Sequence, residues 1–435
     1  MQTNRRTIIK TGTAATLATA VPNILKAQNS TDPIKIGIIG CGGRGGGALA
    51  QALTADPNVI LWAIGDAFQT GVDNAIRIGS RFGKRMQALK ERQFLGLDAY
   101  QGVIDSGVDV VLLCTPPHFR PQHLRATVEA GKHSFVEKPM AVDMPGVRSV
   151  MESTAIAKKK GLSIQHGFCW RFHPGTRMAY EKVLAGELGR VVSVYGTYMS
   201  NPVAPLANGI KKPEGMGDVE FQLRYWQNFE WLSAAHLVEQ CIHTVDKIAW
   251  AMNDVDPVAV VATGGRQSRN DQSNVFDHYN VSYEYPNGVM CHVGQRQLNS
   301  ECHTEVVDRV SCENGTMYAP GMCSIKNTKG EVTWRYRPND DDVTDMYQVC
   351  HNEFFASLRA GKTINTGEYM AKSTALGIFG REAAHTGKRL KWDEFWNDNI
   401  DLAPDDIKFT DSFPVSPVPK PGQPRKRTKP SRPGN

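Results

Sequence analysis

Short runs of consecutive apolar residues alternate with amphipathic segments over the first 170 positions of the 435-residue chain. Five of these runs predict buried strands, at residues 34–40, 59–65, 108–114, 133–136 and 162–168. Three intervening segments predict helices, at residues 46–53, 121–130 and 144–160. Strands that are apolar throughout and alternate with helices are typical of a parallel sheet covered by helices on both faces. Ligands bind such sheets outside the carboxyl ends of the strands.

A different pattern begins near residue 190, where apolar and polar positions alternate along strands joined by short turns. Five strands are expected, at residues 190–199, 258–264, 276–285, 288–295 and 304–311. A period of two marks a strand with one buried face, so we expect a large, mostly antiparallel open sheet. Helical segments at 347–360 and 369–386 are expected to close this second domain.

These patterns divide the chain into four parts. We expect an amino-terminal segment of residues 1–30, a first domain of residues 31–170, a second domain of residues 171–399 and a tail of residues 400–435. The segment 201–232 lies between two strands and has the length of a binding loop. Eight prolines after residue 400 and a basic end predict an extended arm or a disordered tail.

The formal charge of +6 is concentrated at the two ends of the chain. Residues 1–30 carry four basic residues and residues 420–435 carry six, neither stretch contains an acid, and the remainder carries −4. This mildly acidic body argues against a broad basic face for nucleic acid. Nine cysteines without a CxxC pair argue against a zinc ribbon or a disulfide framework.

The amino-terminal segment has the order of an export signal. Arg5 and Arg6 precede Ile8 and Ile9, and a weakly apolar run follows. This order resembles a twin-arginine signal, which implies the twin-arginine export machinery as a partner and a periplasmic or secreted protein. Cleavage after Ala27 and an uncleaved, membrane-tethered terminus are both left open, and the alternative is an ordinary amphipathic start.

A glycine motif with chemical meaning follows the first predicted strand. Gly40, Gly42 and Gly45 form a G-x-G-x-x-G that also contains Arg44, and Asp66 ends the second strand 26 residues after Gly40. The glycines permit a tight turn, close approach to a pyrophosphate and close helix packing. A carboxylate at this position accepts hydrogen bonds from ribose hydroxyls and repels a 2′-phosphate, which favours NAD over NADP. We therefore predict an α/β fold with a Rossmann dinucleotide domain and a second α/β domain built on the large sheet.

Two further motifs carry a family resemblance. The sequence C-T-P-P-H occupies residues 114–118 and G-K-H-S-F-V-E-K-P occupies residues 131–139. Together with the glycine motif they resemble the Gfo/Idh/MocA oxidoreductases over roughly residues 33–390. The resemblance implies that Lys138 lies near the nicotinamide and the substrate hydroxyl. It also implies that Thr115, Pro116, His118 and Glu137 line the cofactor.

Lys138 is a candidate catalytic residue on chemical grounds as well. It stands at the end of a predicted strand and precedes Pro139, so the backbone holds it in place. Desolvation at such a position would lower the pKa of its ammonium towards the working range. The alternative is a salt bridge between Lys138 and a neighbouring carboxylate.

The segment 234–252 predicts the most informative helix, because four ionisable residues share one stripe of it. They are His236, Glu239, His243 and Asp246. The family commonly shows D-x-x-x-H-x-x-D on this helix. The resemblance implies that His243 is the acid or base and that Asp246 orients it or binds substrate. Glu239 stands where many members have an aspartate. A metal site of His236, Glu239 and His243 and a satisfied polar stripe without chemistry are the alternatives; the prediction is no metal.

The segment between the two domains supplies candidate substrate residues. Arg171 and His173 could donate hydrogen bonds to sugar hydroxyls, and Trp170 could stack on a sugar face. Interdomain packing is the alternative for all three.

These inferences predict an exported, NAD-containing oxidoreductase that acts on a hydroxyl of a sugar or glycoside. Because NAD is scarce outside the cytoplasm, such an enzyme has to carry its cofactor and reoxidise it in place, for instance with a second carbonyl substrate. The alternatives are an NAD-dependent glycosidase, which oxidises, eliminates, adds water and reduces again, and a non-catalytic NAD or sugar sensor. The resemblance further implies a homo-oligomer assembled through the open sheet.

Overall fold

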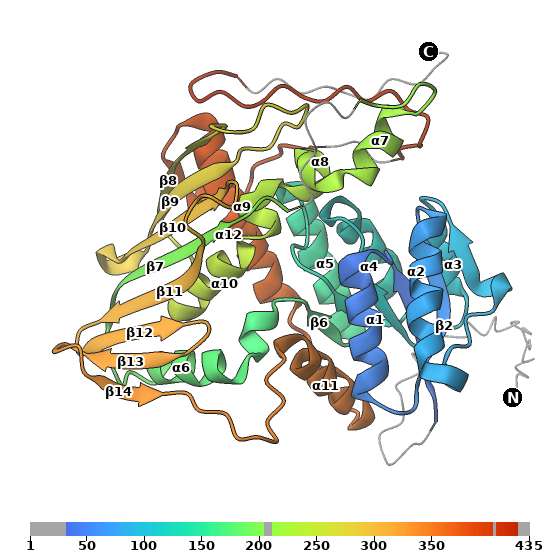
Figure 1. Ribbon diagram of the computed structural model, residues 1–435, viewed down its shortest axis with the longest axis horizontal. Coiled ribbons are helices and arrows are strands. Elements are labelled where there is room, and N and C mark those ends of the chain that lie inside the picture. The colour runs from blue at the N-terminus through green and yellow to red at the C-terminus, as the bar shows by residue number, and fades with distance from the viewer. Residues whose placement is uncertain (1–31, 204–210, 403–405, 425–435) are drawn as a thin grey trace, which may run out of the picture.

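The computed structural model describes residues 32–203, 211–402 and 406–424. The predicted export signal and the end of the tail lie outside the described residues. Two sheets organise the rest, one in each domain, and they stand side by side in Figure 1. No helix in these described ranges is long and apolar enough to cross a membrane.

The first domain is the predicted doubly wound unit. Its six strands pair in parallel in the order β3-β2-β1-β4-β5-β6. The strands are β1 (Ile34–Ile39), β2 (Val59–Asp66), β3 (Gln93–Leu95), β4 (Val110–Leu113), β5 (His133–Val136) and β6 (Ile164–His166). The helices are α1 (Gly43–Ala55), α2 (Gln69–Gly79), α3 (Ala99–Asp105), α4 (Arg120–Glu129) and α5 (Met144–Lys160). The prediction of a Rossmann domain is confirmed.

Helix α5 shows how local sequence sets these bounds. Asp143 caps its start, because the Oδ1 atom accepts a hydrogen bond of 2.9 Å from the backbone N–H of Gly146. The helix ends before Gly161, whose φ of 65° is the left-handed conformation that glycine adopts without strain. Its last turn carries Lys158, Lys159 and Lys160, which complement the negative end of the helix dipole.

The second domain contains a nine-stranded sheet in the order β14-β13-β12-β11-β7-β10-β9-β8-β15. Among the described strands of this sheet only β7 and β10 pair in parallel, which confirms a mostly antiparallel sheet. The strands are β7 (Val191–Ser200), β8 (Ala259–Gly265), β9 (His278–Glu284), β10 (Met290–Gln297), β11 (Glu305–Cys312), β12 (Gly315–Ala319), β13 (Ser324–Asn327), β14 (Val332–Arg335) and β15 (Leu390–Lys391). Alternate positions of β9 and β10 are buried, and the others form the open face.

Helices cover one face of this sheet. They are α6 (Pro174–Leu184), α9 (Ala235–Glu239), α10 (Ile242–Ala251), α12 (Gly367–Thr386) and, at the sheet edge, α13 (Trp392–Phe395). Helix α12 also packs against α5, so it joins the two domains. The buried face and the helices form one continuous apolar core with the adjacent side of the first domain.

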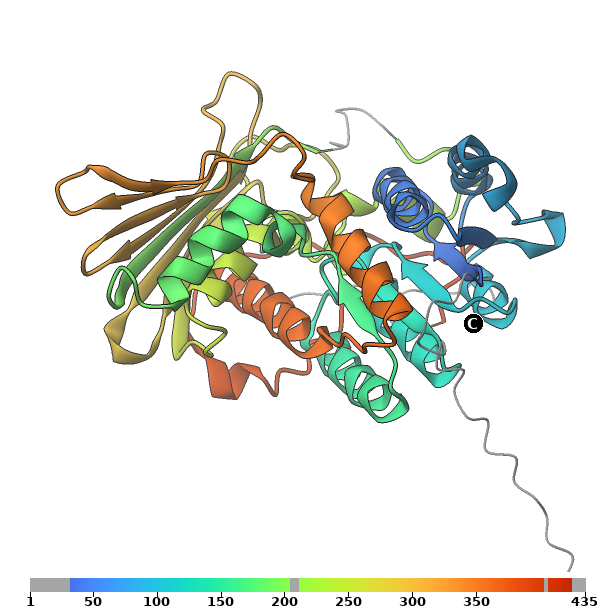
Figure 2. The same ribbon diagram turned by 90° about the horizontal axis from the view of Figure 1, so that it is seen from below.

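One helix lies on a different domain from the one we predicted. Helix α11 (Met346–Arg359) was expected to close the second domain, but it packs against α1 of the first domain (Figure 2). Its side chains Cys350, Phe354 and Phe355 belong to the same apolar cluster as the strands of the parallel sheet. An amphipathic pattern reports that a helix has a buried face, but it does not report which sheet covers that face.

The segment 201–232 also differs from the expected irregular loop. It contains α7 (Asp218–Arg224) and α8 (Glu230–Ser233), which lie above the first domain in Figure 1. Residues 406–424, here called the strap, run back across these helices at the top of that view. Apolar side chains of α7, α8 and the strap form a third cluster, which also contacts Phe68 and Phe119 of the first domain.

Candidate active site

The glycine motif forms the floor of a cleft at the carboxyl end of β1. Gly40 has a φ of 87°, and a Cβ atom there would lie 2.6 Å from the backbone nitrogen of Thr115. A Cβ atom on Gly45 would lie 1.9 Å from the carbonyl oxygen of Gly40, which is far below contact distance. At Gly42 a Cβ atom would meet nothing within 4 Å, because this position faces the open cleft. Gly40 and Gly45 therefore have the tight turn and the close packing expected of them, and the space beside Gly42 is compatible with the predicted approach of a pyrophosphate.

The cleft has a volume of about 800 Å³, which is typical of a ligand site. It runs from the glycine motif past Asp66 and Phe68 to Thr115 and Pro116. Helix α1 begins at its floor without a side-chain cap and without an acidic residue in its first turn. Free N–H groups at a helix start bind phosphate oxygens, so this end of the cleft fits a pyrophosphate.

Asp66 stands where the ribose of a dinucleotide would lie. Its Oδ2 atom accepts a 2.6 Å hydrogen bond from the backbone N–H of Cys41, and its Oδ1 atom accepts one of 2.9 Å from Phe68. Burial raises the pKa of this carboxyl group. Two backbone N–H groups thus fix the Asp66 side chain, and its carboxylate still lines the cleft. A carboxylate acceptor in this place fits the ribose hydroxyls of NAD.

The other expected cofactor residues divide into two groups. Thr115 and Pro116 line the cleft, and Thr115 Oγ1 lies 3.3 Å from His123 Nδ1. His118 instead packs edge-on against Trp231 of α8, with ring centroids 5.1 Å apart. Glu137 is buried and lies 3.2 Å from Arg44 Nε, so these two residues form an ion pair next to the glycine motif.

Lys138 lies at the end of β5 and reaches the second domain. Its Nζ atom donates a 2.5 Å hydrogen bond to the carbonyl oxygen of Glu239 and lies 3.2 Å from Glu239 Oε1. The salt bridge considered for Lys138 therefore exists, and its partner is another predicted site residue. The other carboxylate oxygen, Glu239 Oε2, is buried and has no hydrogen-bond partner among the described residues.

His243 is a buried, neutral imidazole beside this pair. Burial lowers its pKa well below the usual value, and the positive charges of Lys138 and Lys247 lower it further. Its Nδ1 atom has no hydrogen-bond partner among the described residues. Tyr198 of β7 lies nearby, and burial together with the Glu239 carboxylate raises its pKa to about 12. A neutral imidazole and an ammonium group thus occur together, and they can accept and donate a proton respectively.

The predicted helix 234–252 is wrong as a single helix, and this changes the role of Asp246. The chain forms α9 and α10 with a break at Gln240 and Cys241, so the four ionisable side chains do not share one stripe. The Asp246 carboxylate accepts hydrogen bonds from Arg171 at 3.0 Å and from Ser373 at 2.8 Å. In the described structure no hydrogen bond joins the side chains of Asp246 and His243. Asp246 therefore does not orient the His243 imidazole.

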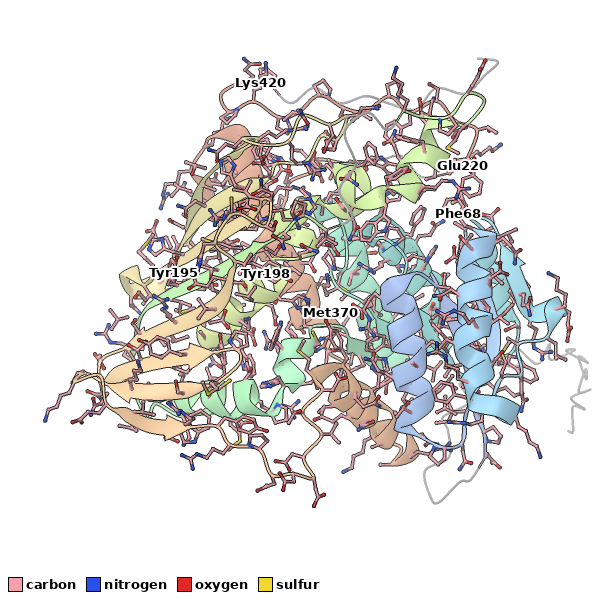
Figure 3. All side chains as sticks on the ribbon, in the orientation of Figure 1. Phe68, Tyr195, Tyr198, Glu220, Met370 and Lys420 are labelled. Atoms are coloured by element: carbon pink, nitrogen blue, oxygen red, sulfur yellow. The ribbon has the colours of Figure 1, made fainter. Side chains whose placement is uncertain are left out.

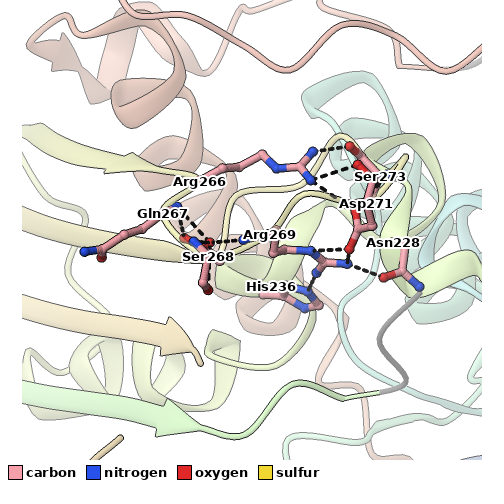
Figure 4. Close-up of polar contacts among 9 residues, drawn as sticks. Asn228, His236, Arg266, Gln267, Ser268, Arg269, Asp271 and Ser273 are labelled. Carbon is pink, nitrogen blue, oxygen red and sulfur yellow. Dashed lines mark hydrogen bonds and ion pairs between the residues drawn. The ribbon is translucent and has the colours of Figure 1, made fainter. Parts of the chain in front are cut away.

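His236 belongs to a separate network of polar contacts around Arg269 (Figure 4). Its Nε2 atom lies 3.0 Å from Arg269 Nη1, and Arg269 in turn binds Asp271. Burial and the Arg269 charge lower the pKa of His236 to about 3. A positively charged guanidinium next to this imidazole is incompatible with a metal ion on the same nitrogen.

The metal alternative fails on geometry as well. In the described ranges, only Glu230, Glu382 and His385 bring three potential ligand atoms within 4.8 Å of one another. His236, Glu239 and His243 do not form such a group. The group that exists surrounds Arg381, whose guanidinium lies 2.8 Å from Glu382 and 3.5 Å from Glu230. It is a buried charge cluster that joins α8 to α12.

Arg171 and His173 already have partners within the protein, and their predicted contact with substrate stays a prediction. Arg171 is ion-paired with Asp246 and with Asp254, at 3.0 and 2.8 Å. These carboxylates raise the pKa of Arg171 above its usual value despite its burial. His173 caps α6 by accepting a 3.1 Å hydrogen bond from the backbone N–H of Thr176. Each side chain is occupied by partners from its own domain or by its own helix.

Sequence reasoning marked the segment 201–232 as a binding loop without assigning a residue in it, and it did not identify two buried glutamines. The cleft is lined by Leu223, Arg224, Tyr225 and Trp226, which belong to the second domain. On β10, both side-chain polar atoms of Gln295 and the Oε1 atom of Gln297 are buried without a partner among the described residues. Regular alternation hides such glutamines, although a polar residue at a buried strand position is a usable signal.

Comparisons with known proteins agree with this geometry. Residues 34–168 match the Gfo/Idh/MocA oxidoreductase family with an NAD-binding Rossmann fold, and residues 176–318 match the Gfo/Idh/MocA C-terminal domain. The chain is 26% identical to inositol 2-dehydrogenase of Paracoccus denitrificans over 301 residues, which is 69% of this chain and 77% of that protein. It is 27% identical to scyllo-inositol 2-dehydrogenase (NAD⁺) of Bacillus subtilis over 42% of this chain and 49% of that one.

Solved structures show the same fold. Levoglucosan dehydrogenase in complex with NADH and levoglucosan superposes with a TM-score of 0.66 at 17% identity, over 83% of this chain and 99% of that one. The WlbA dehydrogenase from Bordetella pertussis, in complex with NADH and UDP-GlcNAcA, superposes with a TM-score of 0.63 over the same shares at 17% identity.

Proposed function

The chain belongs to the Gfo/Idh/MocA family of NAD-binding oxidoreductases, and we propose that it oxidises a hydroxyl group of a sugar or glycoside. The observation that carries this proposal is the group formed by Lys138, Glu239 and His243 at the carboxyl end of β5. It presents one ammonium donor and two buried acceptor atoms, Glu239 Oε2 and His243 Nδ1, that have no partner within the described part of the chain. Unpaired buried polar atoms are costly, and a polyhydroxylated ligand would satisfy them.

The roles of these residues follow from their charge. Bound NAD supplies the acceptor for a hydride from the hydroxyl-bearing carbon. The hydroxyl proton goes to His243, because its neutral imidazole is the acceptor that stays unprotonated at neutral pH. Lys138 is the donor, since its ammonium is fixed by Glu239 and can stabilise the alkoxide as it forms. Glu239 positions Lys138 and offers Oε2 to a second hydroxyl.

The substrate class rests on the polar lining and on the relatives. Gln295 and Gln297 add hydrogen-bonding atoms on the buried face of β10. The matched relatives are named for inositols, which are cyclic polyols, and the matched structures hold levoglucosan or a nucleotide sugar. These observations favour a ring with several hydroxyls over a simple alcohol.

A second candidate is redox-neutral glycoside cleavage at the same site. It is favoured by the position of the segment Leu223–Trp226, which lines the cleft, and of the strap that packs behind this segment. A nucleotide enclosed in this way need not be replaced from solution between turnovers. Oxidation at a ring carbon would acidify the neighbouring C–H bond. Elimination would then expel the aglycone, and water addition and return of the hydride would complete the reaction.

One incubation separates these candidates. Purified protein is mixed with free polyols and a carbonyl acceptor, or with aryl glycosides and no acceptor, and products are identified by mass spectrometry. Carbonyl products from polyols support the oxidoreductase, whereas aglycone release without acceptor supports cleavage. Binding without turnover of either class, unchanged in Lys138→Met, would indicate a sensor instead.

We further propose that the chain is exported through the twin-arginine system. Arg5 and Arg6 support this, with the apolar residues that follow them. Cell fractionation of the full-length protein should place it in the periplasm or medium, or on the membrane if the signal stays attached. The variant with Arg5→Lys and Arg6→Lys should accumulate in the cytoplasm. Equal distribution of both proteins would contradict export.

We also propose that two or more copies associate through the open face of the nine-stranded sheet. The side chains of Tyr195 and Val261 on this face are 40% and 44% exposed. Among the described elements, no helix covers these strands on that side. Light scattering should give a mass above 48.0 kDa for the wild type. A monomeric mass would contradict this proposal.

A further inference from the structure

Residues of the second domain complete the far end of the cofactor cleft. Leu223, Arg224, Tyr225 and Trp226 line it opposite the ribose carboxylate of Asp66. The Arg224 guanidinium lies over the ring of Phe68, 4.3 Å from its centroid. Figure 3 shows Phe68 beneath Glu220 of α7, the helix that ends at Arg224. The adenosine end of a dinucleotide would therefore be enclosed between the two domains.

The strap fixes this covering segment from behind. Phe413 is 2% exposed and packs edge-on against Trp231, with centroids 5.0 Å apart. Its backbone N–H donates a 2.9 Å hydrogen bond to Asp218 Oδ2, and its carbonyl oxygen accepts one of 2.5 Å from Gln222. Asp218 and Gln222 belong to α7, so the strap and α7 share both apolar and polar contacts.

The strap and the chain that leads into it also contact both domains. Phe409 packs with a tilted ring against Phe68 of the first domain, with centroids 5.5 Å apart. Leu402, which precedes the strap, donates a 3.0 Å hydrogen bond to Asp143 of the first domain. Gly422 donates a hydrogen bond of the same length to Thr386 at the end of α12 in the second domain. Moving α7 away from the cleft therefore requires either breaking its contacts with the strap or detaching the strap from both domains.

We propose that the strap locks the segment Leu223–Trp226 over the adenosine end of NAD, so that the nucleotide is retained through many turnovers instead of exchanging after each one. Tyr225 and Trp226 add aromatic surface that suits an adenine ring. This inference rests on the NAD-dependent function proposed above. Retention requires that each hydride taken from one substrate leaves on a second carbonyl compound, or returns to the same sugar.

The dissociation rate of the nucleotide tests this proposal without any sugar. Full-length protein is loaded with NADH and mixed with excess lactate dehydrogenase and pyruvate, which consume free NADH at once. The loss of bound NADH fluorescence then reports dissociation. The wild type should retain NADH through desalting, and Phe413→Ala should release it at least tenfold faster while its circular dichroism stays unchanged.

Two further variants make the result decisive. Asp218→Asn weakens the polar attachment of the strap without opening a cavity, and it should accelerate release in the same direction. Phe355→Ala removes an equally buried ring in the first domain, away from the cleft, and its release rate should match the wild type. Equal release in all four proteins, or release from the wild type within seconds, would overturn the proposal. Retention without sugar oxidation would instead contradict only the proposed function.

Discussion

The two halves of the site are built in different ways. In the cofactor cleft, each residue acts through its place in a short local motif, so Gly40, Gly45 and Asp66 take positions that their spacing predicts. In the substrate half, Lys138 and Glu239 meet across 101 positions of sequence, next to a break between two short helices. Local motifs thus determine where the nucleotide binds, whereas tertiary packing determines the chemistry.

The largest expected effect separates catalysis from cofactor binding. His243→Gln and Lys138→Met should each lower kcat by about 10²–10⁴-fold, because one removes the proton acceptor and the other the ammonium donor. Bound NAD should remain, since neither side chain lines the described cleft. Steady-state kinetics with nucleotide quantification checks this, and His292→Gln on the open sheet face is the control. A loss below tenfold in both variants would contradict the assigned roles.

Next in size is a stability effect at Asp246, which separates packing from chemistry. Asp246→Asn should lower the free energy of unfolding by about 3–5 kcal/mol, because it leaves the buried Arg171 guanidinium with one carboxylate partner fewer. Urea denaturation measures this difference. The pH profile of the remaining activity should keep its shape. A shifted profile with unchanged stability would return Asp246 to an acid–base role.

Two glycines of one motif should behave differently. Gly45→Ala should destabilise the protein by about 1–3 kcal/mol and weaken NAD binding, because its Cβ atom would overlap the Gly40 carbonyl oxygen. Gly42→Ala has room for its Cβ atom, so it should fold normally and lose only affinity for NAD. Thermal unfolding with and without NAD distinguishes the two. Equal melting temperatures without nucleotide would contradict this comparison.

The smallest expected effect is the pH dependence of the free energy of unfolding, to which several buried histidines each contribute a little. Burial lowers the pKa of seven histidines: His123, His133, His166, His173, His236, His243 and His351. Below a pH of about 6.5 the unfolded chain gains protons that the folded chain does not, so the free energy of unfolding falls as the pH falls. Each histidine contributes at most about 1.4 kcal/mol per pH unit. Full stability should be present above that pH.

Urea unfolding at a series of pH values measures this slope. The series runs from about pH 7.5, roughly one unit above the usual histidine pKa, to about pH 5, roughly one to two units below it. Replacing His133 by Gln should reduce the slope by about one proton, because its pKa of about 4 makes it neutral in the folded state. Asp66 has a raised pKa and acts in the opposite sense, towards greater stability in acid. A flat profile would contradict the neutral state of these buried histidines.

The parts of the molecule that the sequence predicted divide in the same way, between the cofactor cleft and the substrate half of the site. Alternating apolar runs predicted both sheets, and the motif around Gly40 predicted the cofactor cleft. The pairing of Lys138 with Glu239 was not predicted, because no sequence rule relates positions so far apart. The break after Glu239 was missed as well, since the residues of the two helices on either side of it are buried and the apolar pattern continues across it.

One error and one contact that was not predicted have the same physical cause. Helix α11 and the strap both pack against elements far from them in sequence, and a buried face does not identify its partner. Arg171 illustrates the polar version of this limit. Its charge indicated a ligand contact, but two carboxylates of the second domain already satisfy it.

A single-turnover experiment tests the central claim most directly. NAD-loaded protein is mixed with a cyclic polyol that carries deuterium on its hydroxyl-bearing carbons, and the absorbance of reduced nicotinamide is followed without any acceptor. We predict that reduced nicotinamide forms, more slowly than with the unlabelled polyol, and that it fails to form in His243→Gln. Absence of reduced nicotinamide with every cyclic polyol and glycoside tried would contradict the assignment of Lys138, Glu239 and His243 as the oxidation site.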